Sequence, residues 1–323
     1  MRLDSLTRPE AAGNGGSKMY RQTGTGRRGL GLAEVVICIA IVGVLALLIA
    51  MALPRSRSSA RTATCRRNLM QIGVALAVYA QQSEALPAVA PLATPGPSPL
   101  ISLLRGLGQD DFNDMVDPAK PPARRGLGPV GAGYLPGLTC PSDRSATSAI
   151  HPAPISYRAV AGPGVDGLGG PFSVGRVTTL ADIKNSDGAS HTLAFVERLV
   201  GDGAGSPLKR GNYARVGKVF PDESCLITAE TPILGDAGSF WGVADWRSTL
   251  ANHALTPNAA PSCIAVDNLT ARMGASSGHS GVAHGLLLDG SVRAFTDKID
   301  PMVWRRWASL RDAPAPAGPA PPP

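Results

Sequence analysis

An uncharged apolar run near the N-terminus constrains this chain more than any other feature. The run covers residues 35–53, nineteen positions without a charged side chain. Because a helix rises about 1.5 Å per residue, residues 30–53 would span about 36 Å, enough to cross the hydrocarbon core of a bilayer. A secretory signal peptide has a shorter apolar region and a small-residue cleavage site, whereas this run ends in Leu53-Pro54-Arg55. The sequence therefore predicts a transmembrane segment over residues 30–53.

The residues in front of the run follow a specific order. An Arg-Arg-Gly sequence ends at Gly29, Leu30 begins the apolar helix, and Glu34 is the fifth residue after the glycine. This order resembles the N-terminal motif of type IV prepilins and type II secretion pseudopilins, although that family usually has phenylalanine and threonine where this chain has Leu30 and Gly31. The resemblance implies that a prepilin peptidase cleaves between Gly29 and Leu30 and methylates the new N-terminus.

Glu34 needs a reason to stand at the edge of an apolar segment. An unpaired carboxylate in hydrocarbon is costly, so it should have a partner. In the pilin family the equivalent glutamate meets the N-terminal amine of a neighbouring subunit, and the resemblance implies that Glu34 sets the subunit register. The alternative is a glutamate that rests at the interface of an ordinary anchor. Arginines flank the run on both sides, so charge alone leaves its orientation open.

An amphipathic helix is predicted directly after the apolar run. Apolar residues recur there with spacings of 4, 3, 4 and 3, which places them on one helical face: Cys65, Leu69, Ile72, Leu76 and Tyr79. Residues 30–84 therefore form one long helix in this interpretation, with its membrane part at 30–53. The stripe is expected to pack against the protein's own globular domain, with packing between subunits as the alternative.

The rest of the chain predicts an α+β domain with mainly antiparallel strands. Asp289-Gly290 separates two apolar runs, which predicts a β-hairpin with a type I′ turn. The sequence therefore divides into five predicted segments. They are a cytoplasmic leader to be cleaved (1–29), the pilin-like helix (30–84), a Pro/Gly-rich linker with short elements (85–133), an extracytoplasmic α+β domain (134–311) and a disordered Pro/Ala tail (312–323).

Several further motifs resemble one larger family. They are Leu-Thr-Cys-Pro-Ser-Asp at 138–143, Ser156-Tyr157, the segment 187–198 (DGASHTLAFVER), and His279 followed after nine residues by Asp289-Gly290. Together they are similar to the large, mostly uncharacterised prepilin-like family that is expanded in planctomycete-type bacteria, in which H-x9-D-G is a C-terminal marker. The resemblance implies a fold and a location more firmly than an activity.

Charge and cysteine content narrow the function classes. The formal net charge is +7, but much of it lies in residues 1–29 and no basic block with interleaved aromatics follows, so nucleic-acid binding is not expected. Four cysteines follow the apolar run without the close spacing of a zinc site. Outside the cytoplasm they would allow two disulfides in three connectivities, and free buried thiols are the alternative: Cys65, Cys140, Cys225 and Cys263.

No catalytic set or metal site stands out. Residues 278–285 lack the spacing and the following helix of a nucleophile elbow, and no HExxH occurs. His279 is expected to brace the hairpin by donating to a carbonyl or to Asp289, and binding a metal with His284 and Asp289 is the alternative. The acidic segment 109–114 lacks the spaced ligands of an EF-hand. We therefore expect no enzyme activity, no cofactor and no metal.

The resulting functional hypothesis is a structural membrane protein. It would be a single-pass protein of the cytoplasmic membrane with an extracytoplasmic C-terminal domain, acting as a pseudopilus or secretion-apparatus subunit. Its partners would be the prepilin peptidase, other pseudopilin-like subunits and inner-membrane lipid. The alternatives are a membrane-tethered binding domain that does not polymerise and, less favoured, an enzyme.

Overall fold

The computed structural model describes residues 31–94, 96–115, 133–148, 150–205, 207–219 and 224–310, without the side chains of residues 49–55 and 113–115. The chain divides into two compact units, residues 1–53 and 54–323. Several sequence predictions lie outside the described residues: the leader, the cleavage site at Gly29 and Leu30, and the tail at 312–323.

Helix α1 spans Leu32–Ser83. Its N-terminus is stabilised locally, because a carboxylate oxygen of Glu34 accepts the backbone N–H of Gly31 at 3.1 Å. A negative charge in the first turn also interacts favourably with the helix dipole. The large apolar side chains of the first described segment are exposed in the chain, with Leu32 at 84% and Ile39 at 66%.

The transmembrane prediction is wrong for the described residues. No helix in the part of the chain that the structure describes is both long and apolar enough to cross a membrane. The long transmembrane helix of the predicted pilin-like fold and the single-pass membrane location that depends on it are therefore not supported.

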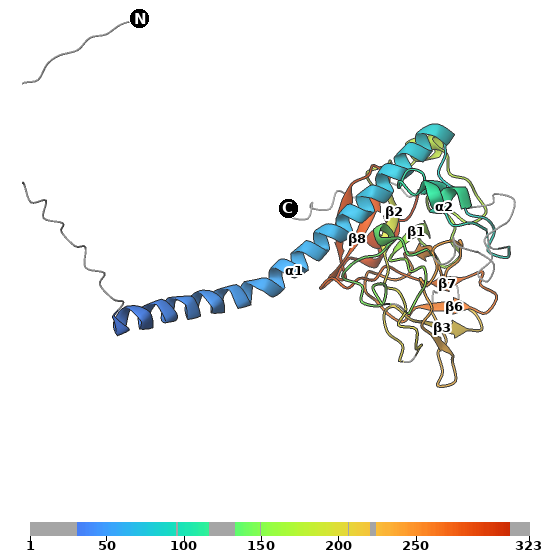
Figure 1. The fold of residues 1–323 in the computed structure, drawn as a ribbon. Coiled ribbons are helices and arrows are strands. Elements are labelled where there is room, and N and C mark those ends of the chain that lie inside the picture. The colour runs from blue at the N-terminus through green and yellow to red at the C-terminus, as the bar shows by residue number, and fades with distance from the viewer. Residues whose placement is uncertain are drawn as a thin grey trace, which may run out of the picture. The chain divides into compact units, whose positions relative to one another are not determined.

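The second half of α1 packs by its predicted stripe. Cys65, Leu69 and Ile72 are fully buried, whereas Arg67 on the opposite face is exposed. Gly73 allows the closest approach: a Cβ there would lie 2.8 Å from the Leu286 side chain. Helix α1 therefore lies beside the sheet that contains Leu286 (Figure 1).

Two sheets form the domain. The larger has five strands in the order β5-β1-β2-β8-β9, and the smaller has four in the order β4-β3-β6-β7. The strands of the larger sheet are Leu250–Asn252, Tyr157–Gly162, Leu193–Glu197, Val282–Leu287 and Val292–Thr296. Those of the smaller are Ile233–Leu234, Tyr213–Val216, Cys263–Ala265 and Ala271–Arg272.

The domain is a mixed α/β fold with two sheets, which corrects the predicted α+β class. Most strand pairings among the described residues are antiparallel, as expected. Each sheet holds one parallel pair, β1 with β5 and β3 with β6. A parallel pair needs a long connection between its strands. Turn residues in the sequence indicate only hairpins between consecutive strands. They therefore could not predict these two parallel pairings.

The β8–β9 hairpin confirms the pairing that Asp289-Gly290 predicts, with a different turn. Leu286 pairs with Val292, the N–H of Leu287 donates to the carbonyl of Ser291, and that of Gly290 donates to the carbonyl of Leu287. Gly290 has a φ of +85°, but Asp289 does not have a positive φ. The three-residue loop is therefore a type I turn closed by a left-handed glycine, because a type I′ turn would need both residues at positive φ.

The remaining elements are short and cover the sheets. They are 3₁₀ helices at Ile101–Leu103 and Pro136–Leu138, and helices α2, α3 and α4 at Asp110–Met115, Leu180–Lys184 and Pro301–Arg306. The segment after α1, predicted to be an extended linker, is held to the domain by isolated bridges from Ala85 to Thr179 and from Val89 to Val174. Its apolar residues, including Leu86 and Val89, are buried, which explains why it packs.

Candidate functional site

The buried carboxylate of Glu197 is the centre of a polar cluster in the core. Glu197 is the last residue of β2, and it is 2% exposed. His284 of the neighbouring strand β8 donates to its Oε2 atom twice, from the backbone N–H at 2.9 Å and from Nδ1 at 3.1 Å. Antiparallel pairing of β2 with β8 brings the two residues together. The carboxylate is thereby fixed through one oxygen.

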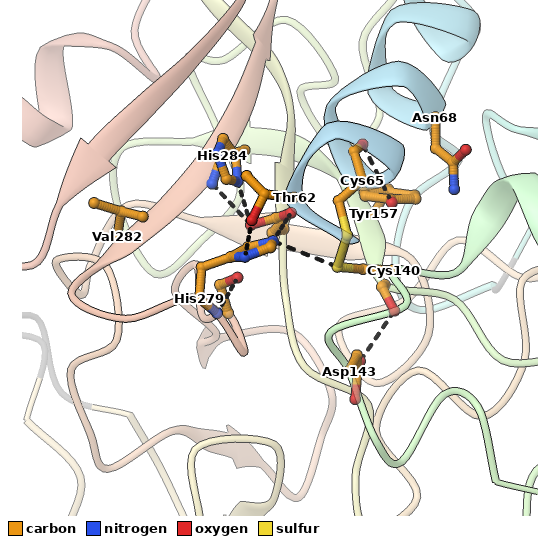
Figure 2. Close-up of polar contacts among 12 residues, drawn as sticks. Thr62, Cys65, Asn68, Cys140, Asp143, Tyr157, His279, Val282 and His284 are labelled. Atoms are coloured by element: carbon orange, nitrogen blue, oxygen red, sulfur yellow. Dashed lines mark hydrogen bonds and ion pairs between the residues drawn. A yellow bond between two sulfur atoms is a disulfide. The ribbon is translucent and has the colours of Figure 1, made fainter. Parts of the chain in front are cut away.

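His279 approaches the other oxygen of the same carboxylate. Its Nε2 atom lies 3.4 Å from Glu197 Oε1 and 3.6 Å from Cys140 Sγ. Its Nδ1 atom lies 3.1 Å from the hydroxyl of Thr62 on α1. Thr62 Oγ1 donates to the carbonyl of Ser58, so it accepts from His279. Figure 2 shows the imidazole between helix α1 and the Cys140 loop.

The proton assignment of His279 follows from these contacts. With Nδ1 as the donor to Thr62, the neutral ring offers a lone pair at Nε2, whereas the protonated ring directs a second N–H at Glu197. Among the described residues, Glu197 Oε1 has no hydrogen-bond partner in good geometry, although Nε2 is within ion-pair distance. A cation between these two atoms, a proton in the simplest case, satisfies both.

The electrostatics of Glu197 reflect two opposing effects. Burial raises the pKa of the carboxyl group, but hydrogen bonds and charge from His279 and His284 outweigh it and hold the pKa at about 2. The carboxylate is therefore ionised at neutral pH. Buried charges are retained only when they are paired and hydrogen-bonded, so the two histidines are the reason that a glutamate is tolerated here.

The loop at 140–143 positions Cys140 beside this cluster. Its last residue, Asp143, is buried and accepts from Ser156 Oγ at 3.0 Å and from the Val200 backbone N–H at 2.9 Å. Burial raises the pKa of Asp143, and these hydrogen bonds lower it. The Cys-Pro-Ser-Asp and Ser-Tyr motifs therefore meet in space: the aspartate fixes the loop, and the loop presents the cysteine.

Helix α1 is joined to this loop by covalent and polar contacts. A disulfide links Cys65 to Cys140 with a Cα–Cα distance of 5.0 Å. Asn68 Nδ2 donates to the Thr139 carbonyl at 3.0 Å, and Tyr157 OH donates to the Cys65 carbonyl at 3.4 Å. These contacts, which Figure 2 places around one turn of α1, fix the helix relative to the first strand of the larger sheet.

The structure pairs all four cysteines that follow the apolar run. The second disulfide joins Cys225 to Cys263 of β6. It lies in a small apolar cluster with Val216 and Val219, away from titratable groups of the Glu197 cluster. One of the three connectivities left open by the sequence is thereby selected, and the free cysteine among the described residues is Cys38, which is exposed.

The other predicted site residues are divided between different roles. His279 and His284 do meet, but Asp289 is not with them: its carboxylate accepts from the backbone N–H and hydroxyl of Ser291. The expected brace from His279 to Asp289 is therefore wrong, because His279 faces α1 and β2 instead. Glu197 was missed. A charged residue within the apolar segment Leu193–Glu197 was its only sequence signal.

The cluster offers metal donors but no room for a substrate. One donor atom each from Cys65, Cys140, Glu197 and His279 lies within 4.8 Å of the others. The cavity in the described structure that reaches Cys140 and Glu197 is too small to hold a water molecule.

Comparison with known proteins gives one family match. Residues 54–302, more than half of the chain, match the family described as "Protein of unknown function (DUF1559)". No curated protein and no solved structure matches the chain. The matched family is not a pseudopilin family, so the prediction of a transmembrane, prepilin-type pseudopilin of type II secretion is wrong. The Arg-Arg-Gly pattern itself lies outside the matched residues.

Proposed function

We propose a function for this chain, which belongs to the DUF1559 family of proteins of unknown function: it is a non-catalytic, extracytoplasmic structural subunit that assembles with further copies of itself. The family is the planctomycete-type family that the internal motifs resemble. One observation carries the proposal, the exposed apolar surface of residues 32–48 in α1. The disulfides add the location, and the crowded polar cluster adds the class.

The apolar surface surrounds its part of α1 on all sides. Side chains at consecutive positions are exposed there by 40% or more, which include Val35, Val36, Ile37, Ile41 and Val42. A helix that is apolar all round is buried in its working state, and exposed apolar patches of this kind mark interaction sites. The same helix in neighbouring copies supplies a matching apolar partner. Glu34, at the start of the segment, is the proposed register residue.

The extracytoplasmic location is supported by the two disulfides. Disulfides form and persist in oxidising compartments and are rare in the cytosol. Cys65, Cys140 and Cys263 are buried, and Cys225 is partly buried against an apolar cluster, as expected for structural bonds. The lack of space beside Glu197 supports a structural role over an enzymatic one.

The assembly proposal is tested on the purified full chain. Cys38 is exposed while the other four cysteines are in disulfides, so a short bis-maleimide reports contact between apolar segments of two copies. We expect covalent dimers, and a mass above that of the monomer in sedimentation velocity. The double variant Ile39→Lys and Val42→Lys should lose both signals, and Met302→Lys, an exposed apolar position outside the segment, should keep them. A monomeric wild-type chain would refute assembly.

One observation favours a second function, a binding domain that does not polymerise. A groove of about 690 Å³ is lined by the basic residues Arg144, Lys209 and Arg210 together with Asp202 and Asn212, and ligand sites have volumes in this range. A chain that stays monomeric, and whose Tm rises with a small dicarboxylate or phosphate ester but not with sodium chloride, would favour this function. Arg144→Ala should then remove the Tm rise.

A further inference from the structure

The cluster at Glu197 contains an unsatisfied pair of atoms that face each other. Glu197 Oε1 is buried and lacks a hydrogen-bond partner among the described residues. His279 Nε2 lies 3.4 Å from it, and Nδ1 of the same ring lies 3.1 Å from the Thr62 hydroxyl. In the neutral form of the ring with its hydrogen on Nδ1, Oε1 and Nε2 are both acceptors, and a cation bound by both atoms satisfies them. Cys140 Sγ is 3.6 Å from the same Nε2 atom.

We propose that the chain binds one Zn²⁺ ion at this cluster when its first cysteine pair is in the dithiol state. The ion takes four ligands: the thiolates of Cys65 and Cys140, Nε2 of His279 and Oε1 of Glu197. Two thiolates with an imidazole select zinc over calcium or magnesium, which prefer oxygen ligands alone. The site and the Cys65–Cys140 disulfide are alternative states of the same side chains.

The distances fit a tetrahedral zinc ion. With Zn–S bonds of about 2.3 Å and Zn–N or Zn–O bonds of about 2.0 Å, ligand atoms stand about 3.8 Å apart for two sulfurs, about 3.5 Å for sulfur and nitrogen, and about 3.3 Å for nitrogen and oxygen. The sulfur–nitrogen and nitrogen–oxygen distances in the structure are 3.6 and 3.4 Å. The two bonded sulfurs must move apart, by rotation of side chains whose Cα atoms are 5.0 Å apart. The other pairs of ligand atoms lie within 4.8 Å of each other.

The surrounding hydrogen bonds orient both oxygen and nitrogen ligands. A metal-bound histidine almost always donates its other ring N–H to an oxygen, which is the contact of His279 Nδ1 with Thr62. The second oxygen of Glu197 is held by His284 through two hydrogen bonds, so Oε1 is directed toward His279.

The two states interconvert by balanced thiol chemistry. Every chain is synthesised with thiols, and each cysteine thiol loses one proton on binding the ion. A protein disulfide then oxidises the pair. The two thiolates give up two electrons and form the S–S bond, and Zn²⁺ is released. The S–S bond of the oxidant breaks, and its two sulfurs take up the two electrons and two protons to become thiols. Zinc binding therefore precedes disulfide formation and protects the thiols.

The test uses the full chain with Co²⁺ as the spectroscopic probe. A phosphine reductant cleaves the disulfides, each yielding two thiols and a phosphine oxide with oxygen from water, and is then removed without air. We expect one equivalent of Co²⁺ with a thiolate-to-cobalt absorption band and tetrahedral d–d bands, and stoichiometric displacement by Zn²⁺. The oxidised chain should bind at least 100-fold more weakly. A reduced chain that shows no thiolate band would overturn the proposal.

Two double variants provide the matched comparison. Cys225→Ser with Cys263→Ser removes the disulfide that lies away from Glu197 and should leave binding unchanged, whereas Cys65→Ser with Cys140→Ser should weaken it at least 100-fold. Equal affinity in both would mean adventitious binding by unfolded thiols and would overturn the site. Glu197→Gln, which keeps the cysteines, should weaken binding 10- to 100-fold, with near-UV circular dichroism as the folding control. Unchanged affinity in that variant overturns the proposal even if the Cys65 and Cys140 variant does not fold.

Discussion

The two disulfides of this domain have the same chemistry and very different surroundings. Cys65–Cys140 joins α1 to a loop beside Glu197 and His279, within the main core. Cys225–Cys263 joins a loop to β6 in a small apolar cluster. The first bond is in contact with groups that carry protons and can bind a metal, whereas the second has only packing around it. The surroundings of a cysteine pair can therefore differ at equal bond chemistry: one pair lies beside a carboxylate and an imidazole, and the other lies among apolar side chains.

The largest expected effect comes from removing each disulfide. The cysteines are 75 residues apart in the first pair and 38 in the second, so the loop-entropy relation gives losses of about 4.5 and about 3.9 kcal/mol in the free energy of unfolding. Urea unfolding of the two double serine variants measures this, and the Cys65 and Cys140 variant should lose more because buried hydroxyls also replace its sulfurs in the main core. A larger loss in the Cys225 and Cys263 variant would contradict the expected order of the two disulfides.

The next effect is a pH dependence that belongs to the first region alone. The folded pKa of Glu197, about 2, lies below the unfolded value of about 4.3. Its contribution of about 3 kcal/mol is therefore complete above about pH 4.3 and is lost as the pH falls toward 2. Glu197→Gln should remove this part of the acid sensitivity in urea unfolding at pH 2 to 7, and the Cys225 and Cys263 serine variant should keep it.

Protonation of His253 contributes a second pH dependence to the free energy of unfolding, and this contribution is the same in every variant. Burial lowers its pKa to about 3, so its neutral form is stabilised by folding. The unfolded histidine binds a proton below about pH 6.5, and stability falls by about 1.4 kcal/mol per pH unit from there to about pH 3. The difference between wild type and Glu197→Gln cancels this term. A difference that stays constant down to pH 2 would contradict the assigned role of Glu197.

The smallest effect concerns the hydroxyl that supports His279. Thr62 and Thr64 both donate to the carbonyl four residues earlier, at 3.1 Å, but only Thr62 also accepts from His279. Thr62→Val leaves a ring N–H without its acceptor and should cost about 1–2 kcal/mol in the free energy of unfolding, whereas Thr64→Val should cost less than about 0.5 kcal/mol. Thermal unfolding by circular dichroism compares them, and equal losses would remove Thr62 from the cluster.

Local patterns predicted the elements that local physics controls. The apolar stripe from Cys65 to Leu76 faces the core as its spacing indicates, and Asp289-Gly290 closes a hairpin. The turn type was wrong because hairpin loops of two and three residues share the same sequence signal. The parallel pairs β1–β5 and β3–β6 gave no local signal, since their partners are joined by long connections.

For the N-terminal apolar run, in contrast, a strong local pattern led to a prediction that the structure does not support. Its length and its Arg-Arg-Gly context predicted a membrane-spanning pilin helix, but no described helix is long and apolar enough to cross a membrane. The family match begins at residue 54, after the run. What the exposed apolar residues do is therefore a question of partners, which the crosslinking of Cys38 addresses.

The sequence by itself determined the helical stripe, the hairpin and the number of cysteines able to pair. Those features depend on the spacing of residues within a few helical turns or within neighbouring strands, and the sequence gives this spacing directly. Only the tertiary structure decided that Cys65 pairs with Cys140, and that His279 and Glu197 stand beside them. These residues come from a helix, a loop and two neighbouring strand ends far apart along the chain, so their meeting depends on how α1 packs on the larger sheet.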